Sequence, residues 1–196
     1  MKPVSRALKN LIKHRYGGKQ GLVKHFGYKC WSHMGGFRDY RCIDWRRVKR
    51  VIFVCRGNIC RSPYCEVKAR QWGIAALSIG LQAKPGRAAQ ADAIRNAGLR
   101  EINLQSHRAK APHQVQMLDS DLLVAMEPWH ADALSRLDSL SGAQITLLGL
   151  WGTSRRPYIQ DPYGRSDAYF QRCFDVIDTS LESMLQRIQK NSSSGI

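Results

Sequence analysis

The sequence predicts an α/β fold, in which helices flank a four-stranded parallel sheet and a basic, partly helical extension precedes them. Strand-like and helix-like segments alternate from residue 49 onward, which is typical of βαβ units and a parallel sheet. Residues 51–54 form an unbroken apolar and largely β-branched run, as in a buried parallel strand. The composition also changes near residue 48, where glycines and basic residues give way to this alternation.

Residues 1–48 form the predicted N-terminal extension. They hold 12 Lys and Arg against two acidic residues, a net charge of +10, whereas residues 49–196 carry +6. Apolar side chains at helical spacing, beginning at Val4, predict a helix over residues 4–15. Aromatic and basic residues alternate in the rest of the extension. We expect it to pack on the domain that follows with a solvated basic face, or to bind an anionic surface rather than nucleic acid.

The first βαβ unit follows the extension directly. The strand over residues 51–54 leads to a helix from Pro63 to about Trp72, because proline suits the first helical turn. Residues 76–79 form a weaker second strand. An alanine-rich helix over residues 88–97 ends at the glycine that follows it.

The second half of the domain repeats the alternation. A strand over residues 121–126 precedes a helix over 128–137, and a strand over 145–148 precedes a loop rich in Gly, Arg and Pro. The last helix has the clearest pattern, because apolar residues recur at helical spacing over 170–188 behind Ser166 as a predicted N-cap.

These patterns divide the chain into the extension (1–48), one domain (49–190) and a flexible tail (191–196). No apolar run approaches the ~20 residues of a membrane span, and the N-terminus lacks the apolar segment of a secretory signal. A cytoplasmic location is therefore expected. Because the domain needs nothing before about Arg47, Met34 is an alternative start of translation.

The six cysteines are irregularly spaced in a chain that is not a small secreted one, which argues against a disulfide scaffold. Cys65 and Cys173 fall on apolar helix faces and are predicted core residues. Two histidines and two cysteines between residues 25 and 42 match no known zinc-finger spacing, so no metal site is predicted.

Residues 51–63 contain the candidate functional residues. A buried strand runs into a loop that ends at a helix N-terminus, where backbone N–H groups can bind an anion. Gly57 and Asn58 tolerate the left-handed backbone that such a loop requires. Cys55 and Arg61 stand at its two ends, so a thiol and a planar guanidinium can both face a bound phosphate.

The same environment favours the thiolate form of Cys55, which makes it a candidate nucleophile. Ser62 can donate a hydrogen bond to this sulfur. Attack on a phosphate monoester also needs a proton for the departing oxygen, and Asp161, stiffened by Pro162, is the candidate acid. Taken singly, the cysteine could be a structural residue and the Asp-Pro pair a plain turn. Their combination favours catalysis.

This combination resembles the low-molecular-weight protein tyrosine phosphatase family. The resemblance rests on the loop over residues 54–63, on Asp-Pro-Tyr at 161–163, and on shorter matches at 78–81 and 107–109. It covers about residues 49–190 and is nearest to the bacterial subgroup paired with tyrosine kinases of exopolysaccharide export. It implies a flavodoxin-like phosphatase core, phosphotyrosine proteins as substrates, such a kinase as partner, and no metal or organic cofactor.

The resemblance also implies roles for individual residues. Cys55 forms a phosphocysteine, Arg61 binds the phosphoryl group, and Asp161 acts first as acid and then as base. Tyr163 and Leu81 line the substrate entrance. The phosphate-binding loop comprises Arg56, Gly57, Asn58, Ile59, Cys60 and Ser62.

Two positions in this loop extend the prediction. Arg56 stands where the family usually has a small or apolar residue, so we expect extra positive charge at the rim and a preference for acidic phosphopeptides. Cys60 is the expected redox partner, able to form a reversible disulfide with Cys55, or else a small buried residue that never pairs.

Two other functions compete with this prediction. A thiol-dependent arsenate reductase uses the same loop, but its relay needs two further cysteines, and none lies between Cys65 and Cys173. The other is a module that binds a polyanion or membrane surface and keeps a vestigial phosphatase core.

Overall fold

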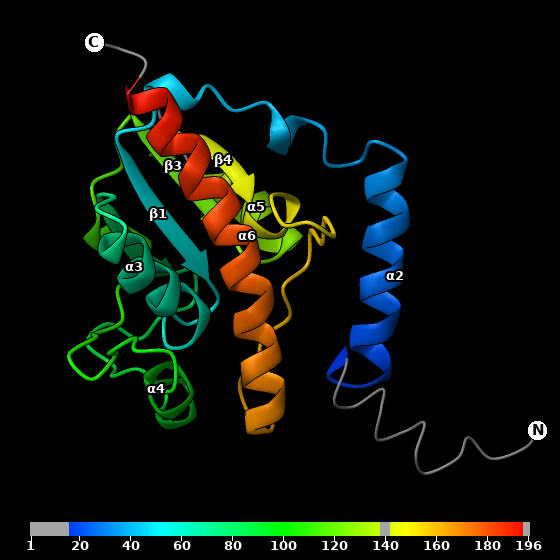
Figure 1. The fold of residues 1–196 in the computed structure, drawn as a ribbon, viewed down its shortest axis with the longest axis vertical. Coiled ribbons are helices and arrows are strands. Elements are labelled where there is room, and N and C mark those ends of the chain that lie inside the picture. Colours follow the sequence, from blue (N-terminus) through cyan, green and yellow to red (C-terminus); the bar gives the residue numbers. More distant parts are fainter. Residues whose placement is uncertain (1–15, 138–141, 194–196) are drawn as a thin grey trace, which may run out of the picture.

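The computed structural model describes residues 16–137 and 142–193. Four parallel strands form one sheet in the order β2-β1-β3-β4, with helices on both faces (Figure 1). The predicted α/β class and parallel sheet are confirmed. The predicted helix over residues 4–15 lies outside the described residues.

All four predicted strands are present, and their ends differ from the prediction by at most one residue. They are β1 (Arg50–Cys55), β2 (Ala76–Gly80), β3 (Asp121–Ala125) and β4 (Gln144–Leu147). β1 and β3 lie in the middle of the sheet and are almost completely buried, which explains their continuous apolar sequence.

Alternate side chains of β1 enter two different cores. Val51 and Phe53 pack on the face covered by the helices α3, α4 and α6, whereas Ile52 and Val54 pack on the face covered by α5. Cys55 belongs to the first core and Val54 to the second, so the carboxyl end of β1 is held from both sides.

The predicted helices are present, with ends that tertiary contacts adjust. They are α3 (Arg61–Gln71), α4 (Ala91–Gly98), α5 (Pro128–Leu134) and α6 (Asp167–Ser193). The prediction that α3 starts at Pro63 is wrong by two residues, because any position of the first turn tolerates a residue without an N–H. α4 starts three residues later than predicted, where the Gln90 side chain accepts a hydrogen bond from the Ala93 N–H.

α6 starts where the predicted N-cap places it and extends beyond the predicted end of the domain. It starts directly after Ser166, whose carbonyl accepts the N–H groups of Tyr169 and Phe170. It then continues to Ser193, so three residues of the predicted tail are helical, because no Gly or Pro interrupts the chain there. Residues 194–196 lie outside the described residues.

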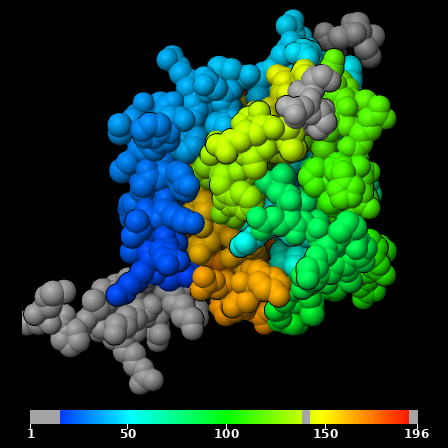
Figure 2. Space-filling model, turned by 180° about the vertical axis from the view of Figure 1, so that it is seen from behind, coloured from blue at the N-terminus to red at the C-terminus, as the bar shows by residue number. Residues whose placement is uncertain are grey.

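The extension contains a helix that the sequence analysis does not locate, α2 (Lys19–His33). Two glycines and several aromatic residues weaken its helical pattern. Figure 2 shows the extension (blue) lying along the flank of the domain, beside the segment that precedes α6 (orange). Phe37, only 6% exposed, packs into the core on the α5 side of the sheet.

The extension also covers the edge strand β4. The Thr146 hydroxyl donates to the Tyr40 carbonyl at 2.6 Å, and Gln144 exchanges two hydrogen bonds with the backbone of Asp44 at 2.7 and 3.0 Å. The indole of Trp45 meets that of Trp151 edge-on at 4.8 Å between ring centres. The open edge of the sheet is thereby covered by the extension.

No helix in the described segments combines the length and apolarity needed to cross a membrane.

Candidate active site

A pocket of about 280 Å³ opens at the carboxyl end of β1, where parallel sheets bind their ligands. Cys55 is the last residue of β1 and is only 2% exposed, and Arg61 is the first residue of α3. The loop between them forms the floor. The pocket is lined by Cys55, Arg56, Gly57, Ile59, Cys60, Gln82, Arg87, Asp161 and Tyr163.

Asn58 gives the loop its shape. Its φ of +54° is left-handed, as the sequence predicts, whereas Gly57 does not adopt a positive φ. The Asn58 carboxamide oxygen accepts the Lys110 N–H at 2.8 Å, and its NH₂ donates to Ser62 at 2.9 Å and to Ser78 at 2.8 Å. These three bonds fix the orientation of the amide and tie the loop to β2 and α3.

The sulfur of Cys55 lies among hydrogen-bond donors. Ser62 Oγ is 3.0 Å from Cys55 Sγ, and the Asn58 N–H donates to the same sulfur at 3.3 Å. The Ser62 hydroxyl accepts a hydrogen bond from the Asn58 amide, and its own proton can point to the sulfur or to the Ile79 carbonyl at 3.4 Å. With its proton on the sulfur side, Ser62 and the Asn58 N–H can together stabilise negative charge on Cys55.

Several other residues support the loop, although the sequence assigns none of them a role. Ser78 Oγ donates to Glu66 Oε2 at 2.5 Å, and Glu66 pairs with Arg70 at 2.7 Å, so the amide of Asn58 rests on a buried polar chain. His107 Nε2 donates to the Asn58 carbonyl at 2.8 Å. Burial lowers the pKa of His107, which keeps the ring neutral with its proton on this nitrogen.

Gly80, at the end of β2, is required by the close approach of the loop. A Cβ at this position would lie 2.6 Å from the Asn58 nitrogen and 2.7 Å from the Gly57 carbonyl carbon. Gly80 and His107 fall in the short motifs that the resemblance includes. The resemblance assigns them no role, and only the fold places them against the loop.

Arg61 is completely buried and held by three oxygen acceptors. Nη1 donates to Glu127 at 2.6 Å and to the Ile159 carbonyl at 2.7 Å, and Nη2 lies 3.0 Å from Asp161. Burial acts to lower the pKa of Arg61, but the two carboxylates outweigh it and raise the pKa. Its buried Nε has no partner among the described residues, so this donor remains for an anion in the pocket.

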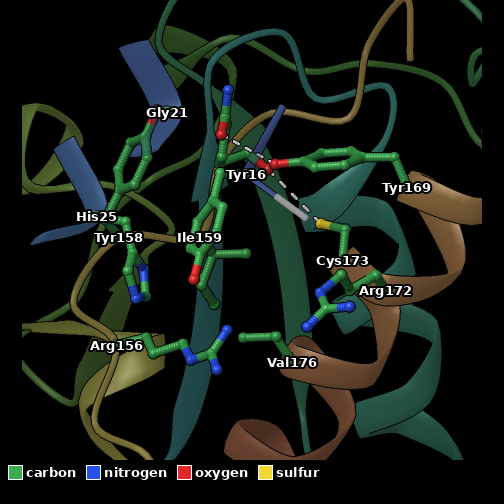
Figure 3. A pocket seen from close by; sticks show the side chains of 11 residues that line it. Tyr16, Gly21, His25, Arg156, Tyr158, Ile159, Tyr169, Arg172, Cys173 and Val176 are labelled. Carbon is green, nitrogen blue, oxygen red and sulfur yellow. Dashed lines mark hydrogen bonds between the residues drawn. The ribbon is translucent and has the colours of Figure 1, made fainter. Parts of the chain in front are cut away.

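Asp161 is placed by α6 and β3. Tyr169 donates to the Gln160 side chain at 2.9 Å and Cys173 to the Gln160 carbonyl at 3.6 Å. Dashed lines mark these bonds in Figure 3, which shows a separate pocket lined by Tyr169 and Cys173 and not by Cys55. The Ile159 N–H donates to the carbonyl of Met126, directly after β3, at 2.9 Å. The Asp161 carboxylate itself is about one-third exposed at the pocket wall, beside Cys55 and Arg61.

Glu127, which positions Arg61, is supported by His130. The His130 Nδ1 accepts the Glu127 N–H at 3.1 Å, and burial lowers the pKa of His130 to about 2. The ring is therefore neutral and serves as an acceptor. Neither residue stands out in the sequence, because both follow a strand that reads as ordinary core.

The entrance differs in one residue from the prediction. Tyr163, 52% exposed, lines it as expected. Leu81 does not, because it packs against the apolar core on the α5 side of the sheet, and the neighbouring Gln82 takes its place on the wall. Arg56 is exposed at the rim and donates to Gln82 at 2.8 Å.

The described cysteines are free, and Cys60 shares the pocket with Cys55. Burial, with Asp161 and Cys55 adding to it, raises the pKa of Cys60, so this thiol is protonated. Cys65 and Cys173 are buried in the core, as predicted. No three His, Cys, Asp or Glu side chains gather as metal ligands anywhere in residues 16–137 and 142–193.

A family model described as low molecular weight phosphotyrosine protein phosphatase matches residues 50–194. The chain is 30% identical over 145 residues to the probable low molecular weight protein-tyrosine-phosphatase AmsI of Erwinia amylovora, covering 73% of this chain and 99% of that one. It is 28% identical over 141 residues to the phosphatase Wzb of Salmonella typhi, covering 71% and 93%.

Solved structures agree with these matches. Vibrio vulnificus Wzb in complex with benzylphosphonate superposes with a TM-score of 0.63 at 27% identity, over 70% of this chain and 97% of that one. The Erwinia amylovora AmsI crystal structure gives a TM-score of 0.60 at 28% identity, over 71% and 92%. The family model begins after the extension, at residue 50.

Proposed function

The chain belongs to the low-molecular-weight phosphotyrosine protein phosphatase family, and we propose that it hydrolyses protein phosphotyrosine through a phosphocysteine on Cys55. By family it is a protein-tyrosine-phosphatase and a hydrolase. The observation that carries the mechanism is the juxtaposition of Cys55 Sγ with the donors of Ser62 and Asn58, in one pocket with Asp161. This pocket combines a nucleophile, an anion cradle and an acid.

In the first step, the Cys55 thiolate attacks phosphorus and the P–S bond forms as the bond to the tyrosyl oxygen breaks. Asp161 gives its proton to that departing oxygen. The phosphoryl oxygens lie against loop N–H groups and the Arg61 guanidinium, whose Nε is the donor that the protein leaves unused.

In the second step, Asp161, now a carboxylate, takes a proton from water, and the water oxygen attacks phosphorus. The P–S bond breaks and inorganic phosphate leaves. The Ser62 hydroxyl, 3.0 Å from the sulfur, stabilises the thiolate as it departs. Glu127 keeps Arg61 oriented through both steps.

The first experiment is hydrolysis of p-nitrophenyl phosphate near pH 6 by the reduced wild type, Cys55→Ser and Asp161→Asn. We expect Cys55→Ser to be inactive. On phosphotyrosine peptides, assayed in parallel, Asp161→Asn should lower kcat by a factor of about 10² or more. Acid quenching during turnover should trap phosphate on the wild type but not on Cys55→Ser. An inactive wild type, or an active Cys55→Ser variant, would refute the mechanism.

The proposed substrates are phosphotyrosine proteins, with a bacterial tyrosine kinase of polysaccharide synthesis or export as the partner. Similarity to the exopolysaccharide-associated subgroup supports this choice. Incubation with an autophosphorylated kinase of that class should remove its phosphotyrosine, as measured with an anti-phosphotyrosine antibody. A phosphoserine protein treated in parallel should keep its phosphate. The cytoplasmic location expected from the sequence accords with such a partner.

Arsenate reduction is the less favoured alternative. Cys65 and Cys173 lie in the core, where neither can pass a disulfide outward. We therefore expect no arsenate-dependent consumption of thiols.

A further inference from the structure

A second hollow, of about 470 Å³, lies beside the pocket that holds Cys55. The two share four lining residues: Arg56, Gln82, Asp161 and Tyr163. A peptide whose phosphotyrosine enters the first pocket can therefore extend into the second. Lys24 of α2 and Tyr158 line the second hollow but not the first, so the extension contributes to its wall.

In this second hollow the carboxylates are ion-paired within the chain, whereas the cations are not paired with carboxylates. Both carboxylates that line it, Glu127 and Asp161, are paired with Arg61. The cations that line it are Lys24, Arg56 and Arg165. Within the described residues, no ion pair joins any of these three to a carboxylate: Arg56 donates to the neutral Gln82, and the Lys24 ammonium lies 5.9 Å from the centre of the Tyr158 ring.

Lys24 is held at this site by the packing of α2. The Tyr28 ring, one helical turn further along, lies 5.6 Å from the Tyr158 ring. Phe37, just after the helix, is buried in the core. The position of Lys24 therefore follows from the fold of the extension and is not that of a free arm.

We propose that Lys24, Arg56 and Arg165 form a subsite that binds an acidic side chain of the substrate next to its phosphotyrosine. The inference rests on the proposed function and adds a specificity element to it. Because the family match begins at residue 50, the Lys24 contribution belongs to the extension and not to the conserved domain. Exposed cations of this kind favour an acidic peptide modestly and in a salt-dependent way.

The test compares two phosphotyrosine peptides, one with two glutamates on each side of the phosphotyrosine and one with alanines there. The readout is the ratio of their kcat/KM values on the same preparation, at low and high salt. We expect the wild type to prefer the acidic peptide, and Lys24→Glu to reduce this ratio by about threefold or more. High salt should reduce the wild-type ratio toward that of Lys24→Glu.

Lys29→Glu is the matched control, because Lys29 lies on the same helix and lines a different hollow with Ser32 and Arg38. It makes the same change in net charge and should keep the wild-type ratio. Arg165→Glu, in an exposed loop, is the second test variant in case Lys24→Glu disturbs α2. Equal ratios in the wild type, Lys24→Glu and Arg165→Glu would overturn the subsite. Failure of the wild type on p-nitrophenyl phosphate would instead overturn the proposed function, since that substrate has no flanking residues.

Discussion

At the scale of single residues, we predict that Cys60 protects Cys55 when the pocket is oxidised. Cys60 is buried, protonated and lines the same pocket as Cys55. If the two sulfurs pair, hydrogen peroxide inactivates the wild type reversibly, because the disulfide forms before the nucleophile is oxidised further. We predict that dithiothreitol restores most of the wild-type activity on p-nitrophenyl phosphate.

Cys60→Ser tests this prediction. Under the same peroxide treatment this variant should lose activity that dithiothreitol does not restore. Cys65→Ser, at a buried position outside the pocket, is the control and should recover like the wild type. Equal recovery of Cys60→Ser would assign Cys60 a purely structural role.

His130 and His107 link stability to pH. Burial lowers the pKa of both rings, to about 2 for His130, so the folded state does not bind the protons that the unfolded state binds below about pH 6.5. Above that pH the two rings are neutral in both states. As the pH falls below it, protons bind to the unfolded state and the free energy of unfolding decreases. We predict that the free energy of urea unfolding decreases between about pH 7 and pH 5.

His130→Asn should flatten this pH dependence, because an amide oxygen can accept the Glu127 N–H without titrating. His113→Asn is the matched control, since His113 is exposed, and its slope should equal that of the wild type. A slope in His130→Asn as steep as the wild-type slope would show that other groups carry the acid sensitivity.

At the scale of elements, Gly80 at the end of β2 leaves room for the phosphate-binding loop because it has no side chain. In Gly80→Ala the new Cβ would contact the Asn58 nitrogen at 2.6 Å, so the loop must shift. Small displacements of this kind are costly for positioned catalytic groups. We predict a loss of about tenfold or more in kcat on p-nitrophenyl phosphate, with a smaller effect on Tm.

Gly98→Ala is the control for this variant. A Cβ on Gly98, at the end of α4, meets no atom within 4 Å, so activity should be unchanged. Full activity of Gly80→Ala would mean that the loop tolerates the displacement and that the close approach is incidental.

At the scale of the whole molecule, the extension is part of the folded unit. Phe37 is 6% exposed in the core on the α5 side of the sheet, whereas Phe26 of α2 is 50% exposed. We predict that Phe37→Ala lowers the free energy of unfolding by about 2–4 kcal/mol, and that Phe26→Ala changes it by less than about 0.5 kcal/mol. Both variants should keep p-nitrophenyl phosphate turnover within about twofold, because the loop and its supports lie after residue 50.

Urea unfolding of the two variants measures this difference. A Phe37→Ala variant as stable as Phe26→Ala would mean that residues before the domain are an appended arm. In that case Lys24 would also lose its fixed position, so this measurement bears on the proposed acidic subsite.

Local patterns in the sequence predict most of the secondary structure and the loop that follows Cys55. Hydrophobic periodicity predicts all four strands, and the segment from Cys55 to Ser62 predicts a tight loop with a left-handed Asn58 and a Ser62 hydroxyl beside the sulfur. These are local properties, because a buried strand, a tight loop and a helix start are encoded within about a dozen residues. The same local signals do not define α2, whose glycines and aromatic residues are not characteristic of a helix.

The tertiary structure sets which groups from distant parts of the chain support that pocket. These groups come from separate strands and loops. Glu127 accepts a hydrogen bond from Arg61, His107 donates to the Asn58 carbonyl, and Gly80 lets the loop approach β2 closely. The tertiary structure also replaced Leu81 with Gln82 at the entrance and placed Lys24 of the extension beside it. Such contacts depend on strand order and on the packing of the extension against the sheet. Strand order and the packing of the extension cannot be predicted from a local sequence pattern, because burial and pairing are properties of the folded chain.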